Sequence, residues 1–149
     1  MKGVYILLLG AKKGFYKSIG SLGRVRFEKG NYAYVGSARS ALFPRIERHF
    51  KKKGKRVHWH IDYLTTSRNI VVREALYASV NSNVVECRLS SMLASLPYSK
   101  AVRAFGSSDC IRGCKSHLYF MKASWEQAGT SIQEIFKKEG LRQSYYWEK

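Results

Sequence analysis

Two tyrosines, Tyr5 and Tyr34, and the basic segment that follows them are well suited to act on a phosphate ester. Arg45 and His49 are four positions apart, so they share one face of a helix. An arginine guanidinium is always charged and can bind phosphate through two parallel hydrogen bonds. A tyrosine hydroxyl can contact the same phosphate, or pass a proton if nearby cations lower its pKa. The alternatives are tyrosines that pack within a sheet and a solvated basic helix face.

Carboxylates and histidines offer a second kind of chemistry. Glu86 is one of only 10 acidic residues in a chain that has 27 basic residues. It could hold a hard divalent cation, which prefers oxygen ligands, or favour the dipole at a helix start. His58, His60 and Asp62 alternate, and on a strand they would lie on one side. That pattern indicates either a metal or acid–base cluster or an ordinary polar strand face.

A third group of residues offers soft metal ligands. Cys110, Cys114 and His117 could bind zinc, with the fourth ligand supplied by Cys87 or Asp109. The alternative is a compact loop with buried thiols. The chain has 3 cysteines, and an odd number argues against a secreted disulfide scaffold.

The charge of the chain predicts a polyanionic partner. The formal net charge is +17, and each phosphate that a cation neutralises releases condensed counterions. Nucleic acid is therefore the expected partner, with solubility alone or a membrane surface as alternatives. The residues expected to contact its backbone are Arg39, Arg48, Lys51, Lys52, Lys53, Lys55 and Arg56.

Length and composition indicate one folded domain. A chain of 149 residues with 45% apolar residues can bury an ordinary core. The apolar run from Tyr5 to Leu9 is far shorter than the roughly 20 residues of a membrane span, and no signal-peptide cleavage pattern follows it. The sequence therefore predicts a cytoplasmic protein without membrane association.

Periodicity places these residues on elements. Glycine-bounded apolar and alternating runs predict strands over 3–10, 24–27 and 31–35, joined in an antiparallel meander with a hairpin turn at 28–31. A helix is expected to begin near Pro44, with Leu42, Ile46 and Phe50 on its inner face.

The C-terminal half is expected to alternate strands and helices. The segment from His58 to Leu64 predicts a strand or a short turn of helix, and 70–80 a strand. A helix starts after Ser82 or Asn83 and ends at Pro97. A loop-rich stretch over 98–113 precedes a last strand, 117–121, and a helix within 124–140.

The motifs also resemble a known family. Gly3-Val4-Tyr5 and Tyr34-Val35-Gly36 are similar to the two halves of the GIY-YIG nuclease signature. Arg45-x-x-Arg48-His49-Phe50 and Glu86 resemble the segments that accompany it. The chain is most similar to the Uri-type branch, through His58-Trp-His-Ile-Asp-Tyr-Leu64, Glu86-Cys87-x-Leu89, Phe105-Gly-Ser-Ser-Asp-Cys110 and Ser116-His117-Leu118. The match runs from about Gly3 to Phe120.

This resemblance implies a small α/β (α+β) fold. Its centre would be a three-stranded antiparallel sheet flanked by helices, with an extra C-terminal strand or helix. The nuclease-like domain would span residues 1–122, and 123–149 would form an extension packed on it. The number of residues between Tyr5 and Tyr34 is larger than in typical members of this family, which places an insertion between the two halves of the signature.

The resemblance also implies an activity, hydrolysis of DNA phosphodiester bonds with one Mg²⁺ or Mn²⁺ ion. Tyr5 would be the general base or would orient the attacking water, and Tyr34 would hydrogen-bond in the same site. Arg45 would stabilise charge on the phosphate, with Arg39 as a rival. The remaining roles are metal binding by Glu86 and support by His49 and His58. The alternatives are a basic nucleic-acid-binding module without catalysis and a zinc-stabilised interaction domain.

Overall fold

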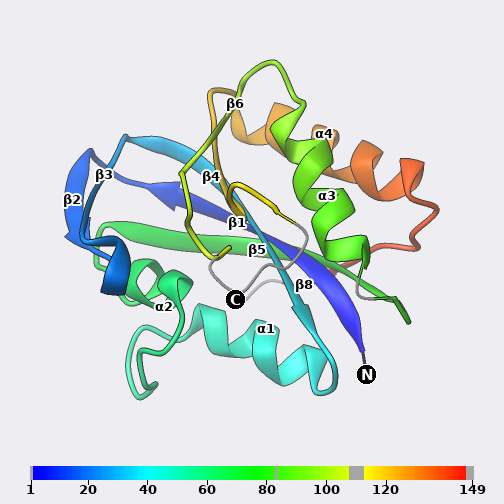
Figure 1. Cartoon of the computed structure of the whole chain (residues 1–149), viewed down its shortest axis with the longest axis horizontal. Helices are drawn as coiled ribbons and strands as arrows, with labels where there is room; N and C mark the ends of the chain where they lie inside the picture. Colours follow the sequence, from blue (N-terminus) through cyan, green and yellow to red (C-terminus); the bar gives the residue numbers. More distant parts are fainter. Residues whose placement is uncertain (1, 83, 108–112, 147–149) are drawn as a thin grey trace.

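The computed structural model describes residues 2–82, 84–107 and 113–146. Within them the chain forms a mixed α and β fold with four α-helices and a six-stranded sheet (Figure 1). The sheet order is β6-β7-β4-β1-β5-β8, and its pairings are antiparallel. The strands, in that order, are Ser99–Ala101, Leu118–Met121, Gly30–Ala38, Gly3–Ala11, Ile70–Ser79 and Ser144–Tyr146.

The central sheet has six strands, so the prediction of a three-stranded sheet is wrong. Strands β4, β1 and β5 do form an antiparallel centre, but β7 extends it beside β4, and β6 and β8 close its two edges. The strand expected as the last is followed by β8, and β6 lies in the stretch expected to be loop. Each of these edge strands has three residues, which is too short for an alternating pattern to show.

Helices cover both faces of the sheet, which explains why all of β1 is buried. Tyr5, Leu7 and Leu9 join the core beneath α1 (Leu42–Phe50) and α2 (His60–Thr65). The alternate residues of β1 join a second core beneath α3 (Val84–Ala94) and α4 (Trp125–Lys138). Figure 1 shows α1 and α2 along one side of the sheet and α3 and α4 along the other.

The prediction that the N-terminal strands form one antiparallel meander is wrong. β2 (Phe15–Ser18) and β3 (Arg24–Phe27) pair with each other in a separate two-stranded sheet, with a short 3-10 helix, η1 (Gly20–Leu22), between them. Strand β4 does not pair with β3; it pairs with β1, in a register that includes every residue of both strands, and on its other side with β7. Full-length pairing with the apolar strand β1 is therefore more favourable for β4 than the short hairpin that the turn signal at 28–31 predicts.

Helix α1 begins two residues before Pro44, which lies in the first turn, where its missing N–H costs nothing. The strand alternative for 58–64 is wrong, because α2 occupies this segment. The Asp62 carboxylate fixes its start by accepting hydrogen bonds from the backbone N–H groups of His58 and Trp59, at 2.8 and 2.9 Å. His58, His60 and Asp62 therefore do not share a strand face.

The C-terminal residues contribute to the same core. Helix α4 buries Ala128, Ile132 and Phe136 against the sheet, and β8 pairs with β5. The domain boundary expected at 122 stays a prediction. None of the helices in the described residues combines the length and apolar character that a membrane span requires.

Candidate active site

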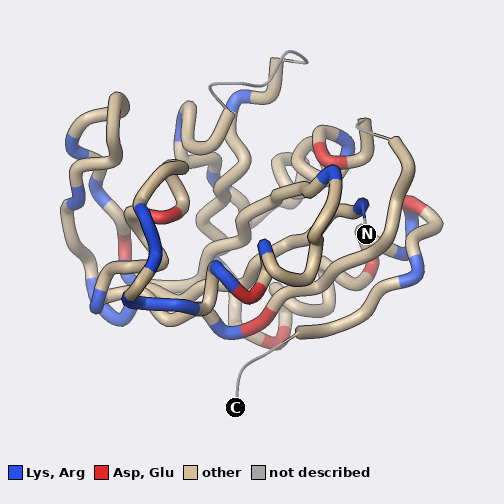
Figure 2. The backbone as a smooth tube through the Cα atoms, turned by 90° about the horizontal axis from the view of Figure 1, so that it is seen from below, with Lys and Arg blue, Asp and Glu red and all other residues tan. Residues whose placement is uncertain are grey.

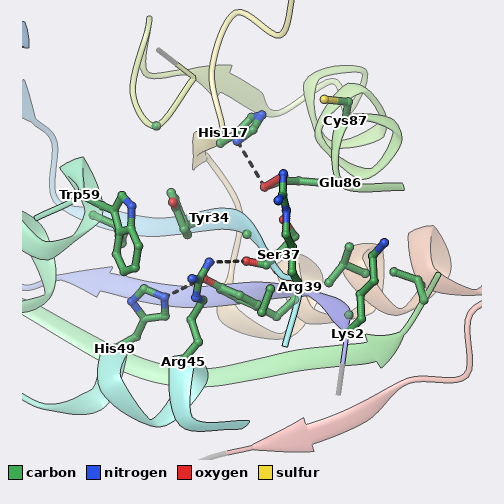
Figure 3. Close-up of a pocket in the computed structure, with 18 of the residues that line it drawn as sticks. Lys2, Tyr34, Ser37, Arg39, Arg45, His49, Trp59, Glu86, Cys87 and His117 are labelled. Carbon is green, nitrogen blue, oxygen red and sulfur yellow. Dashed lines mark hydrogen bonds and ion pairs between the residues drawn. The ribbon is translucent and has the colours of Figure 1, made fainter. Parts of the chain in front are cut away.

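A cleft of about 460 Å³ opens where β1 begins and β4 ends (Figure 3). Residues from several elements line it. β1 supplies Tyr5, β4 supplies Tyr34, α1 supplies Arg45 and His49, and α3 supplies Glu86. Five of the six residues expected to be catalytic are therefore gathered around one cavity, which Arg39 also lines.

Tyr5 and His49 form a buried hydrogen-bonded pair. The Tyr5 hydroxyl lies 2.7 Å from His49 Nε2. Burial raises the pKa of Tyr5 well above its usual value, Tyr34 raises it further, and Arg45 opposes the shift. Burial also lowers the pKa of His49 to about 3, with a contribution from Lys55. Both side chains are therefore neutral near pH 7.

The glycines of both tripeptides lie at points of close packing, and Gly36 makes room for the Tyr5 ring. A Cβ on Gly36 would lie 2.3 Å from Tyr5 Cζ, because the tyrosine ring crosses the neighbouring strand at that point. A Cβ on Gly3 would lie 2.4 Å from the Ala78 carbonyl oxygen and 2.5 Å from Leu42 Cδ2. Both positions require glycine for space, not for an unusual backbone conformation.

Tyr34 lies beside the Tyr5–His49 pair. Its ring meets the rings of His49 and Phe105 edge to face, with centroids 6.2 and 6.3 Å apart. Burial raises its pKa, Glu86 raises it further, and the residue is 9% exposed. Tyr34 is therefore a neutral phenol, and a small part of its side chain is exposed to the cleft.

Two contacts hold Arg45 in place. Its Nη1 donates to the Ser37 carbonyl oxygen at 2.7 Å, and its guanidinium carbon lies 4.7 Å from the centre of the Trp59 ring. A guanidinium has five N–H donors, so this arrangement fixes its plane while leaving donors for an anion.

Glu86 is the one acidic residue among the described residues that line the cleft. Its Oε1 accepts a hydrogen bond from Ser37 Oγ at 3.0 Å, and its Oε2 lies 3.7 Å from His117 Nδ1. The side chain is 23% exposed. In Figure 3, dashed lines join this carboxylate to His117 and Arg45 to Ser37.

Several residues expected at the nucleic acid are engaged within the protein. Arg48 binds both carboxylate oxygens of Asp62, at 2.6 and 3.0 Å. Lys52 donates to the carbonyl oxygens of Ser67 and Ile70, and Lys55 donates to the Arg48 carbonyl oxygen and the Thr65 hydroxyl. Burial lowers the pKa of Lys55 to about 8. The other members of the set, Arg39, Lys51, Lys53 and Arg56, are exposed.

His58 is exposed, stacks edge to face on Trp59 and does not line the cleft. Two residues that do line it, Trp59 and Ser37, are not among those predicted from the sequence. Trp59 lies within the motif from His58 to Leu64, but its stacking on Arg45 and Arg48 depends on the packing of α1 against α2. For Ser37, the position directly after Gly36 is the one signal in the sequence.

The structure brings two of the three expected zinc ligands, Cys114 and His117, close to Cys87. Cys87 Sγ, Cys114 Sγ and a ring nitrogen of His117 lie within 4.8 Å of one another. Cys87 is one of the two residues expected as a fourth ligand. The other, Asp109, and the expected ligand Cys110 lie outside the described residues.

Fold and cleft together define a mixed α+β protein with a polar cavity in which tyrosine, arginine, histidine and one carboxylate converge. The chain belongs to the family described as domain of unknown function DUF123, which matches residues 4–141. No curated protein and no solved structure matches the chain.

Proposed function

We propose that this protein is a metal-dependent endonuclease of the GIY-YIG type that hydrolyses phosphodiester bonds in DNA. The observation that carries the proposal is the convergence of Tyr5, Tyr34, Arg45 and Glu86 on one cleft. These residues come from four elements spread over more than half of the chain. A set of ordinary strand tyrosines and a solvated helix face would have no reason to meet around one carboxylate.

Arg45 has the geometry of a phosphate ligand. Its guanidinium is fixed by Ser37 and Trp59 before any substrate binds, so little side-chain entropy is lost on binding. A fixed cation beside the scissile phosphate stabilises the charge that develops in the transition state. Arg39 also lines the cleft, but the described contacts do not fix its head in this way, so it is the weaker candidate.

Tyr5 is better suited to orient the attacking water than to act as a phenolate base. Its raised pKa keeps the hydroxyl protonated near pH 7. If His49 carries its proton on Nδ1, the hydroxyl donates to the lone pair of Nε2 and turns its own oxygen lone pairs towards the cleft. The oxygen can then accept a hydrogen bond from water, and the costly alternative of a buried phenolate is avoided.

The cleft has the donors that Mg²⁺ or Mn²⁺ prefers. The Glu86 carboxylate and the Ser37 hydroxyl are hard oxygen donors, and Glu86 is partly open to solvent. Such ions are commonly held by one or two carboxylates with water completing the shell. When bound, the ion would supply charge neutralisation at the phosphate and activation of water. Arg45 and Tyr5 would position phosphate and water around it.

Exposed cations on the segment that follows α1 favour a nucleic acid as the molecule that carries the scissile phosphate. Figure 2 shows Lys and Arg positions on many parts of the backbone, with few acidic positions between them. Lys51, Lys53 and Arg56 lie exposed on the connection from α1, which bears Arg45, to Trp59 at the start of α2. This connection can hold the backbone that leads into the cleft.

The test is nicking of supercoiled plasmid DNA in Mg²⁺ or Mn²⁺, with Glu86→Gln as the key variant. We expect cleavage by the parent protein, its loss in Glu86→Gln, and a rate lower by about 10²–10³ in Arg45→Ala. Glu47→Gln is the matched control, because Glu47 is exposed on α1 and does not line the cleft.

Two results would contradict the proposal. Equal cleavage by Glu86→Gln and the parent would remove the carboxylate from the reaction. DNA binding with steep salt dependence but no cleavage in any divalent metal would instead favour the non-catalytic binding module.

A further inference from the structure

A second potential metal cluster lies next to the cleft. Cys87 follows Glu86 directly on α3, while Cys114 and His117 come from the segment that leads into β7. The ligand atoms of the three residues lie within 4.8 Å of one another although the segments are far apart in the sequence. Figure 3 shows Cys87 and His117 at the same end of the cleft as Glu86.

The two nitrogens of the His117 ring differ in their surroundings. Nδ1 faces Glu86 Oε2 at 3.7 Å, whereas Nε2 is buried and has no hydrogen-bond partner in the structure. The side chain is 7% exposed. A buried ring nitrogen without a partner costs free energy, and coordination to a metal would satisfy it.

The donor set favours zinc over a hard cation. Two thiolates and an imidazole match zinc, whereas Mg²⁺ prefers oxygen. Tetrahedral zinc with ligands at about 2.1–2.3 Å holds ligand atoms about 3.4–3.8 Å apart. Since the three atoms lie within 4.8 Å of one another, they need to approach by at most about 1.4 Å, which is within the reach of side-chain rotations.

We propose that Cys87, Cys114 and His117 Nε2 bind a zinc ion that fastens the start of β7 to α3. Water or a further side chain would complete its shell. His117 would be a positioning residue as well as a ligand, because its Nδ1–H would then donate to Glu86. A carboxylate that orients a zinc-bound histidine is a common second partner in such sites. This zinc differs from the ion proposed for catalysis, which Glu86 binds through oxygen.

Elemental analysis of tag-free protein purified without chelators tests the zinc site. We expect about one zinc ion per chain in the parent protein and loss of zinc in Cys87→Ser, Cys114→Ser and His117→Gln. His58→Gln is the matched control, since it removes an exposed histidine from another part of the fold. Zinc content that is unchanged in all three ligand variants would overturn the proposal.

Cobalt substitution keeps the test valid if a ligand variant fails to fold. The parent protein reconstituted with Co²⁺ should show thiolate-to-metal charge-transfer absorption and the visible bands of a tetrahedral site. Alkylation of denatured protein in chelator without reductant should label all 3 cysteines. Absence of the cobalt bands, or a disulfide that includes Cys87 or Cys114, would overturn the proposal.

Glu86→Gln separates the two metal sites. Loss of an orienting carboxylate weakens zinc binding by about 10–100-fold but leaves the ligands in place. The variant should therefore retain zinc when it is supplied in excess. Zinc binding thus stands or falls independently of DNA cleavage, which the same substitution is expected to abolish.

Discussion

The contact between Gly36 and Tyr5 determines whether the candidate site can form. The tyrosine ring lies across the backbone of β4, and only a residue without a side chain leaves room for it. A larger residue at this position must either displace the ring from His49 or separate β1 from β4.

Replacing Gly36 by alanine should therefore be costly. We expect Gly36→Ala to lower the free energy of unfolding by about 3 kcal/mol, because the new methyl group meets a closely packed ring. Gly129→Ala is the matched control. It lies in α4 with no atom within 4 Å of the added Cβ, and should gain about 0.5–1 kcal/mol. Urea unfolding measures both, and similar effects would contradict this account.

His49 makes the stability depend on pH. Its pKa is lowered to about 3 in the folded protein, mainly by burial, while an unfolded histidine titrates at about 6.5. The unfolded chain therefore binds a proton first as the pH falls. The stability that a neutral His49 provides is fully present above about pH 6.5 and is lost progressively towards about pH 3.

We expect His49→Gln to flatten this dependence. Between about pH 6.5 and pH 4.5 the parent should lose about 2 kcal/mol more stability than the variant, because the slope rises from half to nearly all of about 1.4 kcal/mol per pH unit over this range. Unfolding curves at several pH values provide the measurement, and His58→Gln controls for the removal of one histidine. Parallel pH profiles for the parent and His49→Gln would argue against a neutral buried ring.

At the scale of elements, the Arg48–Asp62 ion pair joins α1 to α2. Asp62 is fully buried, and Arg48 is its charged partner. Burial opposes ionisation of Asp62, but the hydrogen bonds from Arg48 and from the amides of Trp59 and His58 lower its pKa. The pair holds Trp59 in the position where it stacks on Arg45.

Removing Arg48 should destabilise the protein far more than removing an exposed arginine. Arg48→Ala leaves a buried carboxylate without its cation, at a cost of about 3 kcal/mol. Arg88→Ala breaks an ion pair with Glu139 in which the arginine is 54% exposed, and should cost under about 1 kcal/mol. Chemical denaturation of the two variants compares them directly, and equal costs would mean that the buried pair is not needed.

Some elements could be predicted because their signals are local. Strand β5 and helices α1, α3 and α4 follow from apolar periodicity, prolines and caps. The pairing of β4 with β1 could not be predicted, because it joins residues that lie between 19 positions (Ala11 and Gly30) and 35 positions (Gly3 and Ala38) apart, in competition with a nearby turn signal. Helix α2 depends on Asp62, which the alternating pattern of the sequence equally favours as part of a strand.

The candidate site was predictable to a similar extent. Tyr5, Tyr34, Arg45 and Glu86 could be chosen from motifs, and the structure gathers them around one cleft. The contacts of Ser37 and Trp59, and the approach of Cys87 to Cys114 and His117, exist only after distant segments pack. The sequence offers Cys87, Cys114 and His117 as candidate zinc ligands, but the distances between them follow only from the packing of α3 against the segment before β7.

At the scale of the whole molecule, the basic residues behind the net charge of +17 have two roles: some donate hydrogen bonds within the protein, and others are exposed and available to a partner. Lys52 and Lys55 donate to carbonyl and hydroxyl oxygens and hold the segment after α1 in place. Lys51 and Lys53 are exposed on the same segment. Neighbouring lysines should therefore have different roles in folding and in DNA binding.

We expect the double substitution Lys51→Ala/Lys53→Ala to weaken DNA binding and to lower the slope of log K against log salt by about 1 for each phosphate that is no longer neutralised. Lys52→Ala and Lys55→Ala should instead lower the free energy of unfolding. Fluorescence anisotropy at several salt concentrations, in a Glu86→Gln background that prevents cleavage, measures the first effect. An unchanged slope would remove Lys51 and Lys53 from the DNA interface.

The position of β1 in the sheet affects how the protein fails on heating. This strand is apolar and wholly buried, and the sheet hides it between β4 and β5 while its two edges are three-residue strands. The native sheet therefore offers little to a second copy, whereas an unfolded chain exposes a segment with strong cross-β tendency. Heat inactivation should become irreversible through aggregation, and the apparent melting temperature should rise with scan rate.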